Sequence, residues 1–133
     1  MNKLTFLVVD DDLIALEVAR ERLESIGFDV SVRDQALGTS SYIVQHRPDF
    51  VLLDVMMPAL TGGELAQVLK RRANHTGVIL YSSKPPGELR ALAEATGALG
   101  SISKAFGDKE FTQEILRLTR RALASVGRAG GER

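Results

Sequence analysis

Three consecutive aspartates, Asp10, Asp11 and Asp12, directly follow an apolar run near the start of the chain. Like charges at neighbouring positions repel one another, so this arrangement lowers stability unless a cation, hydrogen bonds or solvent offsets the repulsion. A further aspartate, Asp54, ends a second apolar run. Carboxylate oxygens without histidine or cysteine partners suit a hard divalent cation that retains several waters, and magnesium fits best. The residue types therefore indicate a metal site built from oxygen ligands.

Two further residue types extend this interpretation to phosphoryl transfer. Such transfer is catalysed chiefly by positioning and by neutralising charge on the phosphoryl oxygens. Ser82 and Lys104 also end short apolar runs, and they offer a hydroxyl and an ammonium group for those oxygens. The nucleophile would be a carboxylate. A metal at Asp10 and Asp11 would need another anionic ligand, which Asp54 or a phosphoryl group bound to it would supply.

The composition narrows the class of protein. The chain has 133 residues and a hydrophobic content of 44%, which suits one compact domain. Lys plus Arg and Asp plus Glu both number 17, so there is no excess of positive charge of the kind found on nucleic-acid-binding surfaces. The apolar runs are shorter than the ~20 residues of a membrane span and no signal-peptide pattern is present, which predicts a cytoplasmic protein. The absence of cysteine excludes disulfides, thiolate metal sites and cysteine nucleophiles.

Strand and helix patterns alternate along the chain. Short apolar runs typical of buried strands are followed by segments with apolar residues at helical spacing. The predicted strands cover residues 4–9, 28–33, 49–55, 77–82 and 99–103, and the predicted helices cover residues 13–26, 34–46, 62–73, 86–97 and 108–125. This alternation predicts right-handed βαβ units. We therefore expect a single α/β domain with a doubly wound, flavodoxin-like sheet of five parallel strands flanked by five helices, written (βα)5.

The ends of the predicted elements place the candidate residues. Ligands of such sheets bind at the carboxyl ends of the strands, which is where the aspartates, Ser82 and Lys104 fall. Asp12 and Asp34 are expected to cap the helices that follow them. The domain is expected to span residues 1–124. Residues 125–133 are rich in glycine and arginine without a helical period, and they predict a flexible C-terminal tail or the start of a linker.

The motifs, taken in order, resemble the receiver domains of two-component response regulators, including the single-domain chemotaxis type. The resemblance covers about residues 4–124 and rests on the segments "VVDDD", "LLDVMMPALTGGEL", "ILYSS" and "SISKAF". It implies a signalling phosphoacceptor of a two-component system or phosphorelay, not an enzyme, which assists its own aspartyl phosphorylation and dephosphorylation. The implied partners are a histidine kinase or histidine phosphotransfer protein and an unknown downstream protein, with no direct contact to nucleic acid or membrane.

Site residues follow from the resemblance by position. It implies that Asp54 is the phosphoacceptor, that Ser82 is the switch hydroxyl and that Lys104 binds the phosphoryl group. It also implies a site for Mg²⁺ or Mn²⁺ with four ligand groups, namely the side chains of Asp10, Asp11 and Asp54 and the backbone carbonyl of Met56.

Two residues depart from the family pattern. The family usually has a proline with a cis peptide bond after the active-site lysine, but here Ala105 follows Lys104. A cis bond before a non-proline residue costs about 2.5–4 kcal/mol, so we expect a trans peptide and an altered loop. The family also usually has an aromatic ring on the last strand, where this chain has Ser101. A serine cannot fill a hydrophobic cavity, so the usual coupling between the site and the partner surface is expected to be weakened or replaced.

The lifetime of an acyl phosphate depends on the side chains that flank the attacking water. In the family these lie two residues beyond the phosphoacceptor and two beyond the hydroxyl, which are Met56 and Lys84 here. We hypothesise that apolar Met56 cannot orient a water, giving slow self-dephosphorylation. Lys84 is expected to contact the phosphoryl group or a partner.

Two other functions remain open from the sequence. An atypical receiver-fold module could signal without phosphorylation, as Ser101 and Ala105 would allow, although the retained acidic residues argue against it. A magnesium-dependent phosphohydrolase with an aspartyl nucleophile is the other. Such an enzyme commonly needs a second acidic residue two positions after the nucleophile, where Met56 stands.

Overall fold

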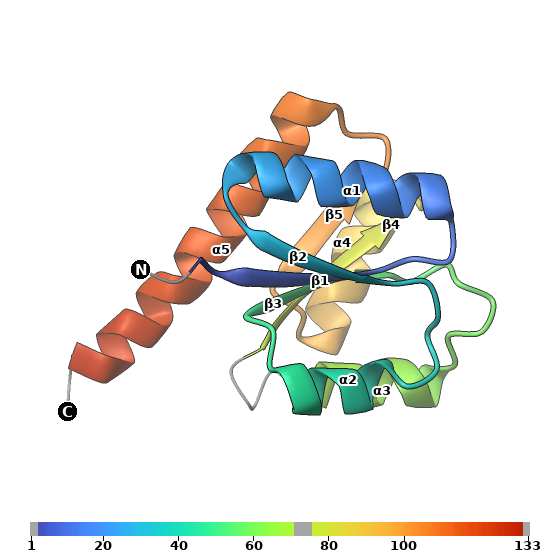
Figure 1. Cartoon of the computed structure of the whole chain (residues 1–133), viewed down its shortest axis with the longest axis horizontal. Coiled ribbons are helices and arrows are strands. Elements are labelled where there is room, and N and C mark those ends of the chain that lie inside the picture. The colour runs from blue at the N-terminus through green and yellow to red at the C-terminus, as the bar shows by residue number, and fades with distance from the viewer. Residues whose placement is uncertain (1–2, 71–75, 132–133) are drawn as a thin grey trace.

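The computed structural model describes residues 3–70 and 76–131, in which strands and helices alternate (Figure 1). In chain order the elements are β1 Thr5–Val9, α1 Leu13–Ile26, β2 Asp29–Arg33, α2 Thr39–His46, β3 Phe50–Asp54, α3 Gly62–Lys70, β4 Gly77–Ser82, α4 Pro86–Thr96, β5 Gly100–Ser103 and α5 Asp108–Gly131. The strands form one parallel sheet in the order β2-β1-β3-β4-β5. The predicted flavodoxin-like domain is therefore confirmed.

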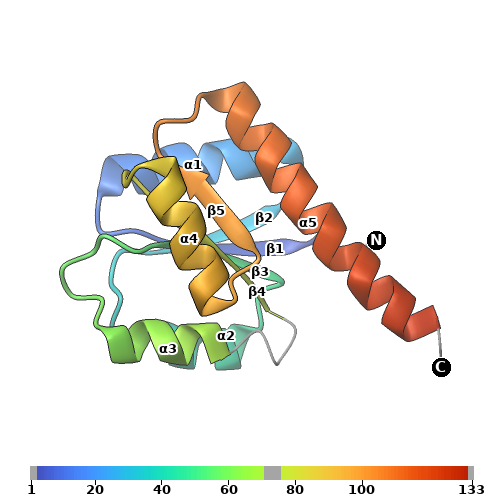
Figure 2. The same ribbon diagram turned by 180° about the vertical axis from the view of Figure 1, so that it is seen from behind.

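Helices cover both faces of the sheet, so the central strands are buried on both sides. All residues of β3 are buried, as its continuous apolar run predicts for a parallel strand. Helices α1 and α5 pack on one face, whereas α2, α3 and α4 pack on the other (Figure 1; Figure 2). This arrangement leaves the carboxyl ends of the strands as the edge where a polar site can form.

Helix α1 begins and ends where the sequence predicted. The Asp12 carboxylate accepts hydrogen bonds from the N–H groups of Ile14 and Ala15 at 3.0 and 3.3 Å, which satisfies donors that have no partner inside the helix. Gly27 ends the helix with a φ of 116°, a left-handed conformation that glycine adopts without steric cost. The prediction that Asp12 is a helix cap is confirmed.

Helix α2 begins later than predicted, and the expectation that Asp34 caps it was wrong. Gly38 precedes the helix with a φ of 85°, which interrupts a right-handed helical run. The Thr39 N–H donates to the Ala36 carbonyl at 3.1 Å, and the Arg33 guanidinium donates to the Leu37 carbonyl at 2.8 Å. These contacts hold residues 35–38 in a separate turn that apolar spacing alone does not reveal.

Helix α5 is longer than predicted. It continues to Gly131, whereas a flexible tail was expected from residue 125. The segment 126–131 contains no proline, and each added residue extends an existing helix by one hydrogen bond, whereas nucleation is the costly step. Figure 2 shows the last turns of α5 extending past the rest of the domain. Residues 71–73 and 132–133, for which a helix and a tail were predicted, lie outside the described residues.

None of the helices in the described part of the chain combines the length and apolar character needed to cross a membrane.

Candidate functional site

The strand order brings the predicted residues to one edge of the sheet. β1 pairs with β3, so that Asp10 directly after β1 lies beside Asp54 at the end of β3. β3 in turn pairs with β4, and β4 pairs with β5, which places Ser82 and Lys104 on the same edge. Residues far apart in the sequence therefore share a site because parallel strands end on the same side.

The carboxylates form a compact cluster. Asp10, Asp11 and Asp54 each offer an oxygen, and these oxygens lie within 4.8 Å of one another. Asp10 and Asp54 are 0% and 3% exposed, whereas Asp11 is exposed to solvent. An all-oxygen donor set with one side open to water suits Mg²⁺ or Mn²⁺, which bind carboxylates and retain water ligands. The residues present therefore fit such an ion.

The three adjacent aspartates have different surroundings, which the sequence alone did not separate. Asp10 is buried, and its Oδ1 accepts a hydrogen bond from the Asp12 N–H at 2.9 Å. Asp12 turns away to cap α1, while the Asp11 side chain belongs to the carboxylate cluster. Asp10 and Asp11 therefore belong to the site, whereas Asp12 belongs to the start of α1.

Lys104 supplies positive charge to the buried carboxylates. Its Nζ lies 2.7 Å from Asp10 Oδ2 and 3.2 Å from Asp54 Oδ2. Burial lowers the pKa of Lys104, but hydrogen bonding to Asp10 and the charges of Asp54 and Asp10 outweigh it, so the pKa lies above its ordinary value. Lys104 is therefore protonated and offsets part of the repulsion between the aspartates.

Both oxygens of Asp54 are oriented by the chain. Oδ1 accepts a hydrogen bond from the Met56 N–H at 2.8 Å, and Oδ2 faces the Lys104 ammonium. Burial raises the pKa of Asp54 above its ordinary value, and the Asp10 charge adds to this effect. The Met56 hydrogen bond and the Lys104 charge act in the opposite direction but do not cancel it. Asp54 is thus a buried carboxylate held in one orientation.

Ser82 ends β4, and Met56 and Lys84, the two residues proposed to affect lifetime, lie in the loops that follow β3 and β4. Ser82 is fully buried, and its Oγ accepts a hydrogen bond from the Lys84 N–H at 3.0 Å. This contact uses the hydroxyl as an acceptor and leaves its proton free to donate to another oxygen. Met56 is 50% exposed, and its backbone N–H is the group that contacts Asp54.

The loop after β5 is ordered without a proline. None of the described residues has a cis peptide bond, which confirms the expected trans Lys104–Ala105 bond. The Ser103 Oγ accepts a hydrogen bond from the Ala105 N–H at 3.1 Å, and the Ser103 carbonyl accepts one from the Phe106 N–H at 3.1 Å. The Lys104 N–H donates to the Ser82 carbonyl at 2.8 Å. These contacts fix the backbone from which the lysine reaches Asp10 and Asp54.

Sequence reasoning missed Ser103 and Tyr81. A serine two residues before Ala105 is a signal for a local side-chain-to-backbone turn. Tyr81 is an aromatic residue in an otherwise aliphatic strand, directly before Ser82. Its buried ring has Lys104 Nζ at 5.4 Å from the ring centroid.

Replacing Ser103 with alanine should lower stability. The substitution removes the acceptor of the Ala105 N–H and should reduce the free energy of unfolding by about 0.5–1.5 kcal/mol, the usual contribution of one hydrogen bond. Urea denaturation measures this effect. Ser83→Ala is the matched control, because Ser83 is exposed in the neighbouring loop. An equal, negligible effect of both substitutions would contradict the role given to the Ser103 hydroxyl.

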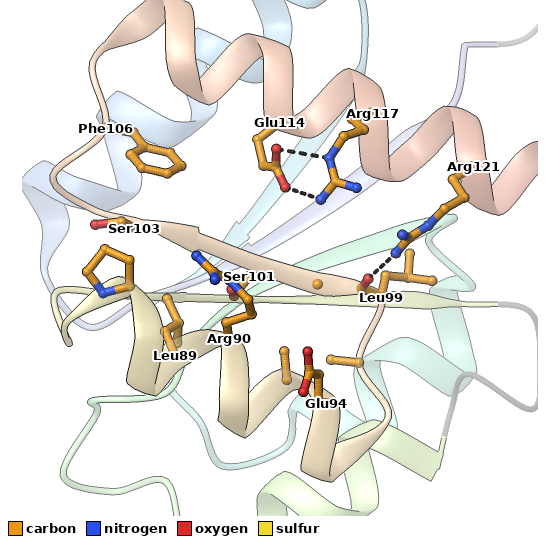
Figure 3. A pocket seen from close by; sticks show the side chains of 14 residues that line it. Leu89, Arg90, Glu94, Leu99, Ser101, Ser103, Phe106, Glu114, Arg117 and Arg121 are labelled. Carbon is orange, nitrogen blue, oxygen red and sulfur yellow. Dashed lines mark hydrogen bonds and ion pairs between the residues drawn. The ribbon is translucent and has the colours of Figure 1, made fainter.

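Ser101 lies in a separate cavity. This cavity of about 540 Å³ lies between α4, β5 and α5, and Figure 3 shows charged side chains from both helices around it. Arg121 donates to the Leu99 carbonyl at 2.8 Å, and Arg117 forms an ion pair with Glu114. Where the family pattern has an aromatic ring, this chain has a small hydroxyl residue beside an open, polar space. Asp10, Asp11 and Asp54 are not among the residues that line it.

The chain is similar to known proteins over most of its length. The response regulator receiver domain family matches residues 6–116. Response regulator MprA of Mycobacterium sp. (strain KMS) is 30% identical over 121 residues, which cover 91% of this chain and 53% of that protein. The chain thus spans about half the length of the curated relatives it matches.

Solved structures give the same result for the fold. A response regulator receiver protein from Burkholderia phymatum is 30% identical with a TM-score of 0.71, covering 87% of this chain and 94% of that one. A CheY-like receiver domain protein from Methanospirillum hungatei JF-1 is 21% identical with a TM-score of 0.80, covering 93% and 99%. The second likeness concerns the fold alone.

Proposed function

This chain belongs to the response regulator receiver domain family, and from that premise we propose that Asp54 accepts a phosphoryl group and that this changes the affinity of the chain for a partner protein. One observation carries the proposal. The buried Asp54 carboxylate is oriented by the Met56 N–H and the Lys104 ammonium, beside the carboxylates of Asp10 and Asp11.

The donor in this proposal is a phosphohistidine of a histidine kinase or histidine phosphotransfer protein. An Asp54 oxygen forms a bond to phosphorus as the bond between phosphorus and the imidazole nitrogen breaks. The imidazole leaves as a neutral ring that keeps the proton on its other nitrogen, and the negative phosphoryl group is now on Asp54. Lys104 and the Ser82 hydroxyl lie on the same sheet edge and would contact the phosphoryl oxygens.

The carboxylate cluster would hold a divalent cation during this step. The ligands of Mg²⁺ or Mn²⁺ would be the side chains of Asp10, Asp11 and Asp54 and the backbone carbonyl of Met56. A bound ion would neutralise charge on the carboxylates and on the phosphoryl oxygens.

The proposed signal is a population shift. Phosphorylation adds a group with a charge of about −2 next to Lys104, which now contacts Asp10 and Asp54. Lys104 and the Ser82 hydroxyl then have a new anionic partner. An arrangement of the loops after β3 and β4, and of α4, that favours these new contacts becomes more populated.

The experiment that tests the proposal measures the intact mass of the native chain and of Asp54→Ala after incubation with acetyl phosphate and Mg²⁺.

One observation favours a second function, an interaction module that signals without phosphorylation. Lys104 already offsets part of the charge of the buried carboxylates, so the fold does not require a phosphoryl group. An unmodified mass would support this module.

Met56 offers a test of phosphoryl lifetime. Met56→Asn should speed hydrolysis of phospho-Asp54 roughly two- to twelvefold, because an amide can orient the attacking water with one hydrogen bond worth about 0.5–1.5 kcal/mol. Loss of the added mass over time, after removal of the donor, measures the rate. Val44→Asn is the matched control, since Val44 on α2 is 51% exposed and Met56 is 50% exposed. An unchanged rate in Met56→Asn would contradict the hypothesis.

A further inference from the structure

We propose that Tyr81 is a positioning residue whose ring holds the Lys104 ammonium beside Asp54. The inference rests on the proposed function, because it concerns the lysine that would bind the phosphoryl group. It adds a residue that neither the family resemblance nor the sequence pattern assigned to the site.

The place of Tyr81 in the sheet is fixed by its backbone. Tyr81 lies on β4 directly opposite Asp54 of β3, and on the other side it is opposite Ile102 of β5. Its carbonyl accepts a hydrogen bond from the Val55 N–H at 3.1 Å, next to the phosphoacceptor. Movement of the phosphoacceptor loop is therefore linked directly to the strand that carries the ring.

The orientation of the ring is fixed by packing. Tyr81 is 2% exposed and lies in the core between the sheet and helices α1 and α5. The Phe111 ring of α5 packs edge-on against it, with centroids 6.3 Å apart and an interplanar angle of 76°. A buried aromatic ring with such a neighbour has few alternative rotamers. Tyr81 therefore presents a fixed ring face.

The fixed face of the Tyr81 ring lies next to the Lys104 ammonium. Lys104 Nζ lies 5.4 Å from the Tyr81 ring centroid while it contacts Asp10 and Asp54. A lysine has a long flexible side chain, and the negative face of an aromatic ring attracts its ammonium, more strongly where water is excluded. The Lys104 side chain is only 19% exposed. The Tyr81 ring thus restricts the Lys104 side chain to conformations in which the ammonium lies beside the carboxylates.

The departures from the family pattern at Ala105 and Ser101 explain why a contact that orients Lys104 would matter in this chain. The loop that carries Lys104 has no proline to fix it, and Ser101 supplies no aromatic ring (Figure 3). Tyr81 is an aromatic residue on the neighbouring strand and on the opposite face of the sheet, where its core cluster includes Ile102. Tyr81 can therefore orient the Lys104 ammonium although the chain lacks both the proline and the aromatic ring of the family pattern.

The test compares Tyr81→Leu with Tyr81→Phe. Leucine keeps an apolar side chain in the core but removes the ring, so we expect the rate of phosphoryl uptake from acetyl phosphate with Mg²⁺ to fall about five- to tenfold. The Tyr81 hydroxyl makes no hydrogen bond to any residue that the structure describes, so phenylalanine should keep the rate within about twofold of the native chain. Intact mass over time gives both rates.

Two further variants separate positioning from folding. Phe6→Leu removes another fully buried ring of the same core cluster, at the opposite end of the strands, and should leave the rate unchanged while it lowers stability. In a Lys104→Ala background, Tyr81→Leu should cause no further loss of rate, because a residue that acts through Lys104 has no effect once the lysine is absent.

The outcomes distinguish this inference from the function on which it rests. A native chain that takes up phosphoryl groups, with Tyr81→Leu equal to it, would overturn the inference and leave the function standing. A loss of rate that persists at the same size in the Lys104→Ala background would also overturn it. A native chain without any uptake would overturn the proposed function, and the role of Tyr81 with it.

Discussion

Asp54→Ala should abolish phosphoryl uptake. The native chain incubated with acetyl phosphate and Mg²⁺ is expected to gain the mass of one phosphoryl group, and the variant is expected to gain none. The reason is that Asp54 is the carboxylate of the site whose two oxygens are oriented, one by the Met56 N–H and one by Lys104. Transfer needs such a carboxylate as the nucleophile. Intact mass measures the result.

A second aspartate controls for loss of charge. Asp34 follows β2 at the same edge of the sheet but is exposed and lies outside the carboxylate cluster, so Asp34→Ala should be phosphorylated like the native chain. An adduct that persists in Asp54→Ala would place the phosphoryl group on another residue. The absence of an adduct in the native chain would favour the module that signals without phosphorylation.

Lys104→Ala should lower the stability of the chain when Mg²⁺ is absent. The substitution leaves Asp10 and Asp54 buried side by side without their cation. Removing one partner of a buried ion pair costs about 3 kcal/mol in the free energy of unfolding, because a charge remains in the interior without compensation. Urea denaturation in a chelating buffer measures the loss.

Magnesium should reverse much of this loss. An ion that binds only the folded chain stabilises it according to its concentration and affinity. We expect a larger gain in Lys104→Ala than in the native chain, where the ammonium already offsets part of the carboxylate charge. Lys109→Ala is the matched control, since Lys109 is an exposed lysine at the start of α5. A Mg²⁺ response of equal size in all three proteins would contradict an effect of Lys104 on the ion, and no response in any of them would contradict a metal site at the carboxylate cluster.

Much of the fold could be predicted from local patterns. The boundaries of α1 follow from Asp12 and Gly27, which lie at its two ends and act on their own backbone. Gly77–Ser82 was predicted as a strand at its observed bounds, because its apolar run is short and continuous. The start of α2 was not predicted, since it depends on the conformation of Gly38 and on the Arg33 side chain that bonds to its turn.

The sequence predicted which residues lie at the candidate site, but not which of them contact one another. Parallel strands end at one edge, so the motifs alone indicated that Asp10, Asp54 and Lys104 would lie near one another. Residue types and spacing did not predict that the ammonium contacts both buried carboxylates or that Tyr81 lies against it. Such contacts depend on strand order and register, which are properties of the whole sheet.

The sequence by itself determined the alternation of strands and helices, the oxygen chemistry of the site and the departures at Ser101 and Ala105, because these depend on residue type and local spacing. The tertiary structure decided which of the adjacent aspartates are buried, which partner each Asp54 oxygen takes and how Lys104 is held. Lys104 and Asp54 are 50 positions apart in the chain, and only the pairing of β3, β4 and β5 brings them within hydrogen-bonding distance. Charges interact over a few ångströms, and sequence separation does not set that distance.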